Sequence, residues 1–339
     1  MSRVLGNVSE YVREHQEKET HPWTILLAGG EGRRLSPFVR AIHPDNRPKQ
    51  FATIIGTRSM LQHTYDRALR HSPPEKILIA ITAGQEQWAF EQLPQALERN
   101  FLIQPRNLDT GPAIALAVAR VMAQEPFASI LVMPTDHFVH PEDALARNLD
   151  EALSSLREIG ETGMILMGAY PTKPSDGLGW ILPKAAVSPD GRSRLLRVRD
   201  FVEKPRREVA QSLYESGALW NTFILAGQVR AFWHSLRQSV PEITSRLAQA
   251  CYRLNGDCLH KPEQVFGDTE PFNFSTSVLA RGSSRLFVMP LIEVSWNDWG
   301  TPEGVLESIE TLGWEHRLCE RWTESAVLEA TGVPLVASI

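Results

Sequence analysis

The stretch that decides the fold is LLAGGEGRRLSPF, which runs from Leu26 to Phe38 and overlaps an apolar run, Thr24–Ala28, that we expect to form a strand. A glycine-rich turn at the carboxyl end of a strand lets backbone N–H groups approach a phosphate closely. The alternative is a glycine turn that only shapes the chain. Two adjacent arginines in the turn, Arg33 and Arg34, favour phosphate binding.

Two common phosphate-binding patterns do not fit this turn. A P-loop needs Gly-Lys followed by Ser or Thr, whereas Arg33 follows Gly32. The dinucleotide-binding pattern GxGxxG would start at Gly30 and needs a third glycine where Leu35 stands. The pattern that fits in order is AGGxGxRLxP, formed by Ala28, Gly29, Gly30, Gly32, Arg34, Leu35 and Pro37.

The rest of the chain alternates short apolar runs with helical patterns. Runs such as Ile77–Thr82 and Ile130–Pro134 are typical of strands that are buried on both faces of a parallel sheet. Between such runs, Ser59–His71 and Pro112–Gln124 have apolar residues at helical spacing. This order predicts an α/β fold with a doubly wound, mostly parallel but mixed sheet. The other expected strands are Phe101–Gln104, Met164–Ala169, Leu195–Val202, Phe223–Ala226 and Arg285–Leu291, and the other expected helices are Val229–Gln238, Pro241–Leu254, Pro302–Leu312 and Glu324–Ala330.

Composition argues against several classes of protein. Hydrophobic residues make up 42% of the 339, which is enough for a large core and argues against a disordered chain. A net charge of -5 without a basic run gives no support for binding to nucleic acid or to an anionic membrane. The charged first twenty residues and the lack of an apolar run of roughly 18 residues predict a cytoplasmic protein. Three cysteines without a CxxC pair argue against a disulfide scaffold.

Further motifs follow the glycine-rich turn in a fixed order. Together with it, they resemble the motifs of sugar-1-phosphate nucleotidyltransferases, and the PKQF element resembles that of mannose-1-phosphate guanylyltransferases. The resemblance implies a Rossmann-like, GT-A-like nucleotidyltransferase fold with a sugar-binding lobe. The motifs are Pro48-Lys49-Gln50-Phe51, Asp109-Thr110-Gly111-Pro112-Ala113, Pro134-Thr135-Asp136-His137, Phe201-Val202-Glu203-Lys204-Pro205, Trp220-Asn221 and Trp296-Asn297-Asp298-Trp299-Gly300.

The implied reaction joins an NTP and a sugar 1-phosphate into a nucleotide sugar and pyrophosphate. GTP and mannose 1-phosphate, which give GDP-mannose, are the first expectation. One alternative is a glucose-1-phosphate thymidylyl- or uridylyltransferase, and another is a regulatory protein that binds nucleotide sugars without catalysis. The reaction brings two anions together, so it depends on positioning and charge neutralisation. The catalytic candidates Arg34, Lys49, Asp136, Lys204 and Asp298 argue against the regulatory alternative.

The resemblance also implies roles for these residues. Arg34 would hold the β- and γ-phosphates, and Lys49 would lie near the α-phosphate, although either one is otherwise an ordinary surface cation. Asp136 follows an expected strand, where ligand sites of open α/β sheets gather. With Asp298 it would bind Mg²⁺ or Mn²⁺. The alternatives are a helix N-cap for Asp136 and a turn carboxylate for Asp298. His137 is expected to support the site rather than to bind metal.

Lys204 would bind the sugar phosphate, and Glu203 would accept hydrogen bonds from sugar hydroxyls; the alternative is an exposed ion pair. Adjacent strand residues point to opposite faces, so both can reach the sugar only if the chain bends there, which Pro205 favours. The full sets expected are Leu27, Ala28, Gly29, Gly30, Gly32, Arg34, Lys49, Gln104 and Gly111 for the nucleotide, and Gly179, Glu203, Lys204 and Asn221 for the sugar phosphate.

Some positions depart from the resemblance. Thr222 and Phe223 stand where Ser-Gly is common, and Ser275 replaces an expected acidic residue. These changes indicate a divergent, bacterial-type branch. We expect an N-terminal extension (1–21), a catalytic domain (22–315) and a C-terminal helical tail (316–339). The catalytic domain would divide into a nucleotide-binding half (22–160) and a sugar-phosphate-binding half (161–315). This leaves no room for the isomerase domain of bifunctional relatives. Whether the chain forms a homo-oligomer stays open.

Overall fold

The computed structural model describes residues 21–187, 193–253 and 265–314. The expected N-terminal extension, apart from His21, lies outside the described residues. So do the C-terminal tail with its helix Glu324–Ala330 and the expected helix end at Leu254.

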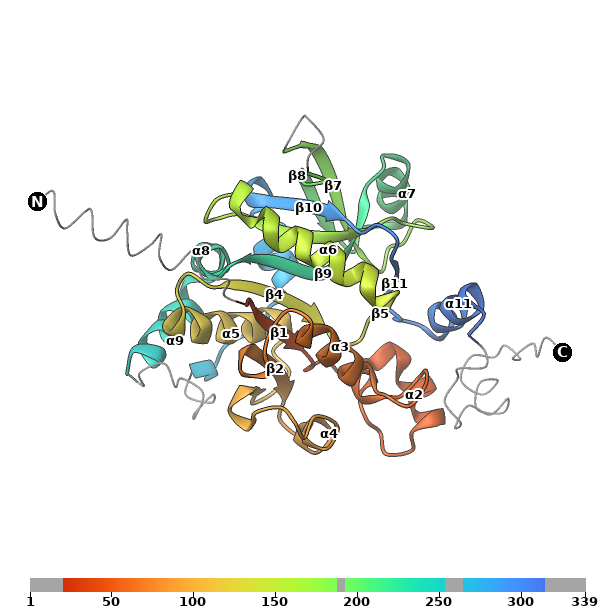
Figure 1. Cartoon of the computed structure of the whole chain (residues 1–339), viewed down its shortest axis with the longest axis horizontal. Coiled ribbons are helices and arrows are strands. Elements are labelled where there is room, and N and C mark those ends of the chain that lie inside the picture. The colour runs from red at the N-terminus through yellow and green to blue at the C-terminus, as the bar shows by residue number, and fades with distance from the viewer. Residues whose placement is uncertain (1–20, 188–192, 254–264, 315–339) are drawn as a thin grey trace, which may run out of the picture.

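A mixed nine-stranded sheet forms the centre of the molecule (Figure 1). Its strand order is β3-β2-β1-β4-β9-β6-β10-β8-β7, and the first four strands of this order are parallel. β9 lies antiparallel between β4 and β6, and it joins the first half of the chain to the second within one sheet. The bounds are β1 (Trp23–Leu27), β2 (Ile77–Thr82), β3 (Phe101–Gln104), β4 (Ser129–Pro134), β6 (Met164–Ala169), β7 (Gly179–Ala186), β8 (Leu196–Glu203), β9 (Leu219–Gln228) and β10 (Leu286–Pro290).

Helices cover both faces of this sheet because its strands are apolar on both sides. Ile25 and its neighbours on one face pack with α5 (Thr110–Gln124), α8 (Val229–Ser239) and α9 (Pro241–Arg253). Leu26 and its neighbours on the other face pack with α3 (Met60–Leu69), α4 (Glu86–Gln92) and α6 (Glu142–Ser155). A further helix, α7 (Arg207–Glu215), contacts β7. The doubly wound α/β arrangement is therefore confirmed.

A small third cluster positions two of the predicted site residues. It joins α2 (Ser36–Ile42) and α11 (Pro302–Leu312) to a two-stranded sheet of β5 (Phe138–His140) and β11 (Ser295–Asn297). The rings of Phe138 and Trp299 stack here with their centroids 4.8 Å apart. Asp136 precedes β5 and Asp298 follows β11, so this pairing brings the two carboxylates to the same place.

The expected elements agree with the structure in most places, and the differences have physical reasons. Ile77–Thr82, Met164–Ala169 and Pro302–Leu312 form as predicted. The strand expected at Phe223–Ala226 is longer, because β9 continues through a bulge back to Leu219. β7 was not predicted, since Gly179 and Pro183 interrupt its apolar pattern.

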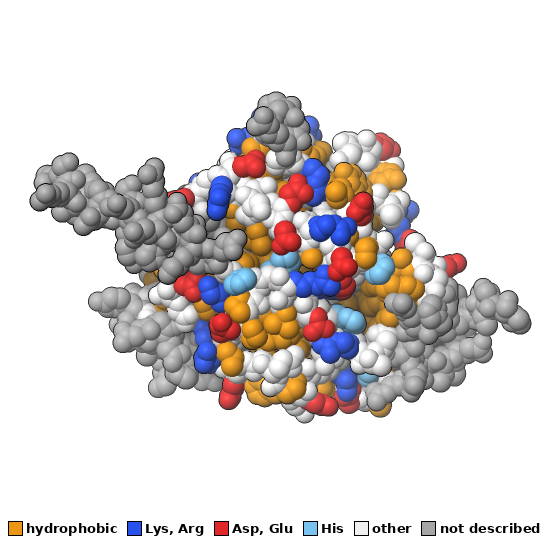
Figure 2. Space-filling model, in the orientation of Figure 1, with side chains coloured by type: hydrophobic (Ala, Val, Ile, Leu, Met, Phe, Trp, Pro, Cys, Tyr) orange, Lys and Arg blue, Asp and Glu red, His pale blue; other side chains and the backbone are white. Residues whose placement is uncertain are grey.

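Acidic and basic side chains are interspersed on the face of the molecule that Figure 2 shows. Ion pairs also link neighbouring helices: Arg67 of α3 and Glu142 of α6 lie 2.8 Å apart. Within the described ranges, every helix is too short or too polar to span a bilayer.

Candidate active site

A cavity of about 680 Å³ opens at the carboxyl ends of the parallel strands and brings together most of the predicted site residues. This is the edge at which open α/β sheets bind ligands. The predicted residues that line the cavity are Leu27, Gly29, Gly30, Gly32, Arg34, Lys49, Gln104, Asp136, Gly179, Glu203, Lys204, Asn221 and Asp298.

The glycine-rich turn lies against Lys49. Gly32 has a φ of 60°, and a Cβ atom added to it would lie 2.7 Å from the Cβ of Lys49. A side chain at this position would therefore strain the backbone and collide with its neighbour. Glycine here allows the turn and Lys49 to approach each other within one wall of the cavity.

Side chains from neighbouring segments hold the carbonyl groups of the turn. Gln50 Nε2 donates hydrogen bonds to the carbonyl oxygens of Ala28 (2.5 Å) and Gly30 (2.8 Å), and Thr82 Oγ1 donates to that of Gly29 (3.0 Å). In a trans peptide, the N–H points away from the C=O. The N–H groups of these same peptides are therefore turned away from Gln50 and Thr82.

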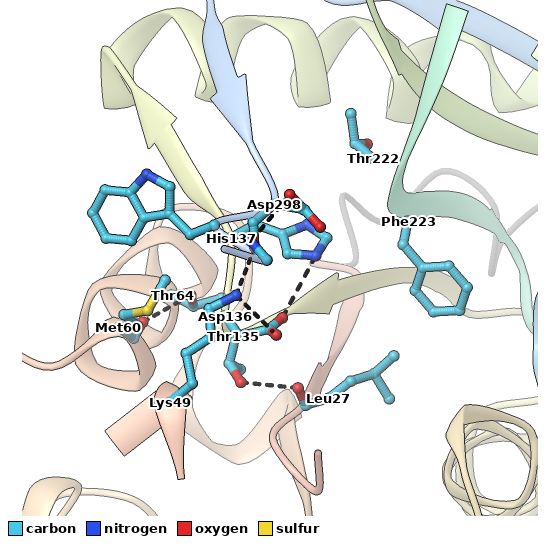
Figure 3. A network of polar contacts seen from close by, with 12 residues as sticks. Leu27, Lys49, Met60, Thr64, Thr135, Asp136, His137, Thr222, Phe223 and Asp298 are labelled. Atoms are coloured by element: carbon cyan, nitrogen blue, oxygen red, sulfur yellow. Dashed lines mark hydrogen bonds and ion pairs between the residues drawn. The ribbon is translucent and has the colours of Figure 1, made fainter. Parts of the chain in front are cut away.

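Lys49 occupies the junction between the two predicted metal ligands (Figure 3). Its Nζ donates to the backbone carbonyl of Asp298 at 2.5 Å and lies 3.3 Å from Asp136 Oδ2. Only 4% of its side chain is exposed, and a buried ammonium group is stable only with partners such as these. The interpretation of Lys49 as an ordinary surface cation is thus wrong.

Asp298 is held from two sides. Its Oδ1 accepts a hydrogen bond from Gly300 N at 3.1 Å, as a turn carboxylate does, and its Oδ2 lies 3.4 Å from Arg34 Nη2. A Cβ atom on Gly300 would lie 2.5 Å from Asp298 Oδ2, so this glycine leaves room for the carboxylate. The Arg34 side chain is 61% exposed, and its guanidinium remains accessible from the cavity.

Asp136 precedes a strand rather than a helix, so the helix N-cap alternative is wrong. Burial would raise the pKa of its carboxyl, but Lys49 and His137 outweigh this and hold the pKa below its usual range. Burial lowers the pKa of His137, against the opposing effect of Asp136. Asp136 is therefore an ionised carboxylate, and 37% of its side chain is exposed.

The opposite side of the cavity carries the residues predicted for the sugar phosphate. β8 ends at Glu203, and Lys204 has a φ of 44°, so the chain bends at this point as expected. A Cβ atom added to Gly179 would lie only 2.6 Å from Glu203 Oε2. Glycine at this position therefore leaves space for the Glu203 carboxylate.

Burial raises the pKa of Glu203, while Lys204 and a hydrogen bond from Ser275 oppose the change. Ser275 lines the cavity and begins a π-helical turn, Ser275–Leu279. The serine that departs from the family pattern therefore contacts one of the predicted sugar-binding residues.

Two predicted residues lie beside the cavity rather than in its lining. The Ala28 backbone is held by β2 through a 2.8 Å hydrogen bond to the carbonyl of Ala80 and by Gln50. Gly111 packs under Phe272, whose ring would lie 2.1 Å from a Cβ atom on this glycine. The geometry thus gives both positions a role in shaping the backbone.

Comparison with known proteins decides the family. Residues 23–313 match the model of the nucleotidyl transferase family. The chain belongs to the nucleotidyl transferase family. The xanthan biosynthesis protein XanB of Xanthomonas campestris pv. campestris is 29% identical over 300 residues, which are 85% of this chain and 60% of that protein. A mannose-1-phosphate guanylyltransferase of Salmonella montevideo is 33% identical over 207 residues, which are 58% of this chain and 41% of that protein.

The crystal structure of mannose-1-phosphate geranyltransferase from Thermus thermophilus has the same fold. It superposes with a TM-score of 0.70 at 25% identity, and the match covers 83% of this chain and 77% of that one.

Sequence reasoning missed several residues that shape this nucleotidyl transferase site. Gln50 lies within the PKQF element, so its motif was a signal for it. Thr82 ends a predicted strand, and its position at the ligand-binding edge of the sheet was a weaker signal. Thr135 Oγ1 donates to the Leu27 carbonyl at 2.8 Å and joins the ends of β4 and β1. Gly300 has no signal except its place in a motif.

Proposed function

We propose that this protein is a sugar-1-phosphate nucleotidyltransferase that joins an NTP to a sugar 1-phosphate and releases pyrophosphate. The proposed substrates are GTP and mannose 1-phosphate, and the product is GDP-mannose. Relatives named mannose-1-phosphate guanylyltransferase support this choice. The chain spans 60% of the length of the relative from Xanthomonas.

One observation carries the proposal. A buried lysine, Lys49, is held between the two carboxylate-bearing segments of Asp136 and Asp298, directly beside a glycine turn. Lys204 and Glu203 line the same cavity. A site for two phosphorylated substrates needs cations on both sides of the reacting phosphorus, and this cavity supplies them.

In the reaction, an oxygen of the sugar phosphate attacks the α-phosphorus of the NTP. A new P–O bond forms, and the bond to the oxygen bridging the α- and β-phosphates breaks, so that pyrophosphate leaves with the electron pair. Lys204 would hold the attacking phosphate, and Arg34 with the glycine turn would hold the leaving one. Lys49 would exchange its present partners for a phosphate oxygen and stabilise the charge that develops there.

The residues present fit a magnesium ion. Asp136 and Asp298 offer only oxygen donors, and their side chains are 37% and 24% exposed. Mg²⁺ is usually held by one or two carboxylates together with phosphate oxygens and water. Among the described residues, no three His, Cys, Asp or Glu side chains gather into a metal site. Asp136 and Asp298 would hold the ion together with the NTP, and it would neutralise phosphate charge.

A pyrophosphate-release assay tests the proposal. The full chain is combined with Mg²⁺, one nucleotide (ATP, GTP, CTP, UTP or dTTP), and mannose or glucose 1-phosphate. We expect release that requires both substrates and is fastest with GTP and mannose 1-phosphate. A preference for dTTP or UTP with glucose 1-phosphate would contradict the proposed substrates but support the proposed type of reaction. No release with any pair, or release without a sugar phosphate, would refute the function.

Two adjacent arginines give a matched control. Arg34 faces Asp298, whereas Arg33 pairs with Glu31 and its side chain is 85% exposed. Arg34→Ala should lower kcat/KM by about 100-fold, and Arg33→Ala should have a much smaller effect. Equal losses would show that only the general charge of the turn matters.

A further inference from the structure

Phe223 has a backbone conformation that side chains rarely adopt. Its φ is 58°, in the left-handed region that favours glycine. Such a conformation persists only where the surrounding structure holds it, and such residues cluster at ligand sites. Phe223 lines the cavity described above and is half-buried.

The surroundings of Phe223 form a bulge in β9. Leu225 pairs with Leu166 of β6, but Asn221 already pairs with Gly168, so β9 has two extra residues here. Thr222 Oγ1 donates to the Met167 carbonyl at 2.7 Å and accepts a hydrogen bond from Ile224 N at 3.2 Å. The bulge therefore keeps its hydrogen bonds and is a built feature of the strand.

The bulge places Phe223 at the cavity. On the β4 side, Leu225 pairs with Val132. Phe223 and Pro134 each lie two positions further along their strands, toward the cavity. Both line the cavity, and Asp136 follows Pro134 by two residues. Figure 3 shows Phe223 extending from its strand on the side of Leu27. Phe223 thus lines the cavity near the carboxyl end of β4.

The same residue is also connected to the sugar side. Phe223 N donates to Asn221 Oδ1 at 3.1 Å, and its ring packs edge-on against Phe274 with the centroids 6.4 Å apart. Phe274 precedes Ser275, which hydrogen-bonds to Glu203. The backbone of Phe223 is therefore tied to a residue predicted for the sugar, Asn221, and its ring packs against Phe274.

Resting on the proposed function, we propose that Phe223 is a specificity-determining residue that narrows the sugar side of the cavity. It admits hexose 1-phosphates whose ring substituents are hydroxyl groups, and it excludes those with an acetamido group. An acetamido group needs more room than a hydroxyl group, and its N–H and C=O need hydrogen-bond partners. An immobile phenyl ring supplies neither the room nor the partners.

The test compares kcat/KM for mannose and glucose 1-phosphates with kcat/KM for N-acetylmannosamine and N-acetylglucosamine 1-phosphates. The wild-type protein should prefer the plain hexoses by about 100-fold or more, and Phe223→Gly should reduce this preference by at least about tenfold. Phe223→Leu keeps most of the bulk and should keep most of the preference. Phe127→Ala, at an exposed ring outside the cavity, is the control and should leave the preference unchanged.

Phe223→Ala serves as a second variant, with circular dichroism to check that each variant is folded. The assignment of Phe223 is wrong if wild type, Phe223→Gly and Phe223→Ala show the same preference. It is also wrong if the wild-type protein turns over the acetamido sugars as fast as the hexoses. Either result leaves the proposed function standing. If the wild-type protein fails to release pyrophosphate with every combination of NTP and hexose 1-phosphate, the proposed function fails and this inference fails with it.

Discussion

Replacing Gly32 with alanine should disable the site through Lys49. The new Cβ atom would lie 2.7 Å from Lys49 Cβ and 3.3 Å from Lys49 N, so the lysine backbone, not only its flexible end, has to move. The left-handed φ of 60° adds a cost of about 1 kcal/mol for an alanine. Crowding a packed contact adds about 1–3 kcal/mol, so we expect a loss of about 2–4 kcal/mol in the free energy of unfolding.

Two other glycines separate these contributions. Gly56 has nearly the same φ, 65°, but an added Cβ atom would have no neighbour within 4 Å, so Gly56→Ala should lose only about 1 kcal/mol. Gly30 has neither a positive φ nor a neighbour within 4 Å. Gly30→Ala should therefore leave stability unchanged within about 1 kcal/mol.

Urea unfolding of the three variants measures these differences, and pyrophosphate release measures the effect on Lys49. Because Lys49 Nζ donates hydrogen bonds to two segments, a displacement approaching 1 Å should lower kcat by about 100-fold in Gly32→Ala. Gly56→Ala should keep its activity. If Gly32→Ala is no less stable than Gly56→Ala, the contact with Lys49 does not constrain this turn.

Further outcomes test other parts of the site and of the core. Asp136→Asn should remove Mg²⁺-dependent turnover and the strengthening of NTP binding by Mg²⁺ while circular dichroism stays unchanged; persistent pyrophosphate release would exclude Asp136 as a metal ligand. Lys204→Ala should raise KM for the sugar phosphate far more than KM for the NTP, and an equal rise in both would argue against a role in sugar-phosphate binding. Burial lowers the pKa of His71 more than Asp150 raises it. At a pH below the ordinary pKa of histidine, the unfolded chain therefore binds more protons at this residue than the folded chain does. Stability should therefore be complete above about pH 7 and decline as the pH falls, by up to about 1.4 kcal/mol per pH unit, and His71→Asn should flatten that decline in urea unfolding.

Local patterns predicted those parts of the fold that local physics determines. An unbroken apolar run such as Ile77–Thr82 can only be buried on both sides, so it was recognised as a strand to the residue. The place of Asp136 after β4 was equally predictable, because ligand sites gather at that edge. The motifs then indicated that Lys49 and Asp298 belong to one site, and the structure brings Lys49 Nζ to the backbone carbonyl of Asp298, although the two residues are 249 positions apart.

Tertiary packing decided what the sequence did not reveal. Phe223 stands where glycine is common in the family pattern, which was a signal for a left-handed backbone, but the bulge that holds it depends on Thr222 reaching the Met167 carbonyl of another strand. Gly300 leaves room both for the carboxylate of its neighbour Asp298 and for Arg34, which approaches it from a distant segment of the chain. The 3.0 Å contact between His71 and Asp150 likewise joins segments that are far apart in the chain.

Charge gives a physical reason for a metal ion at this site. The cavity lining holds four cationic and five carboxylate side chains, so its formal charge is -1 while His137 is neutral. Burial raises the pKa of Glu203, yet even a protonated Glu203 would leave the lining only neutral. An NTP is a polyanion, and low local dielectric strengthens its repulsion from Asp136 and Asp298. Lys49 and Arg34 already pair with these carboxylates, so a divalent cation on Asp136 and Asp298 would both cancel the repulsion and free Lys49 for the phosphates. The carboxylates are Glu31, Asp109, Asp136, Glu203 and Asp298, and the cations are Arg33, Arg34, Lys49 and Lys204.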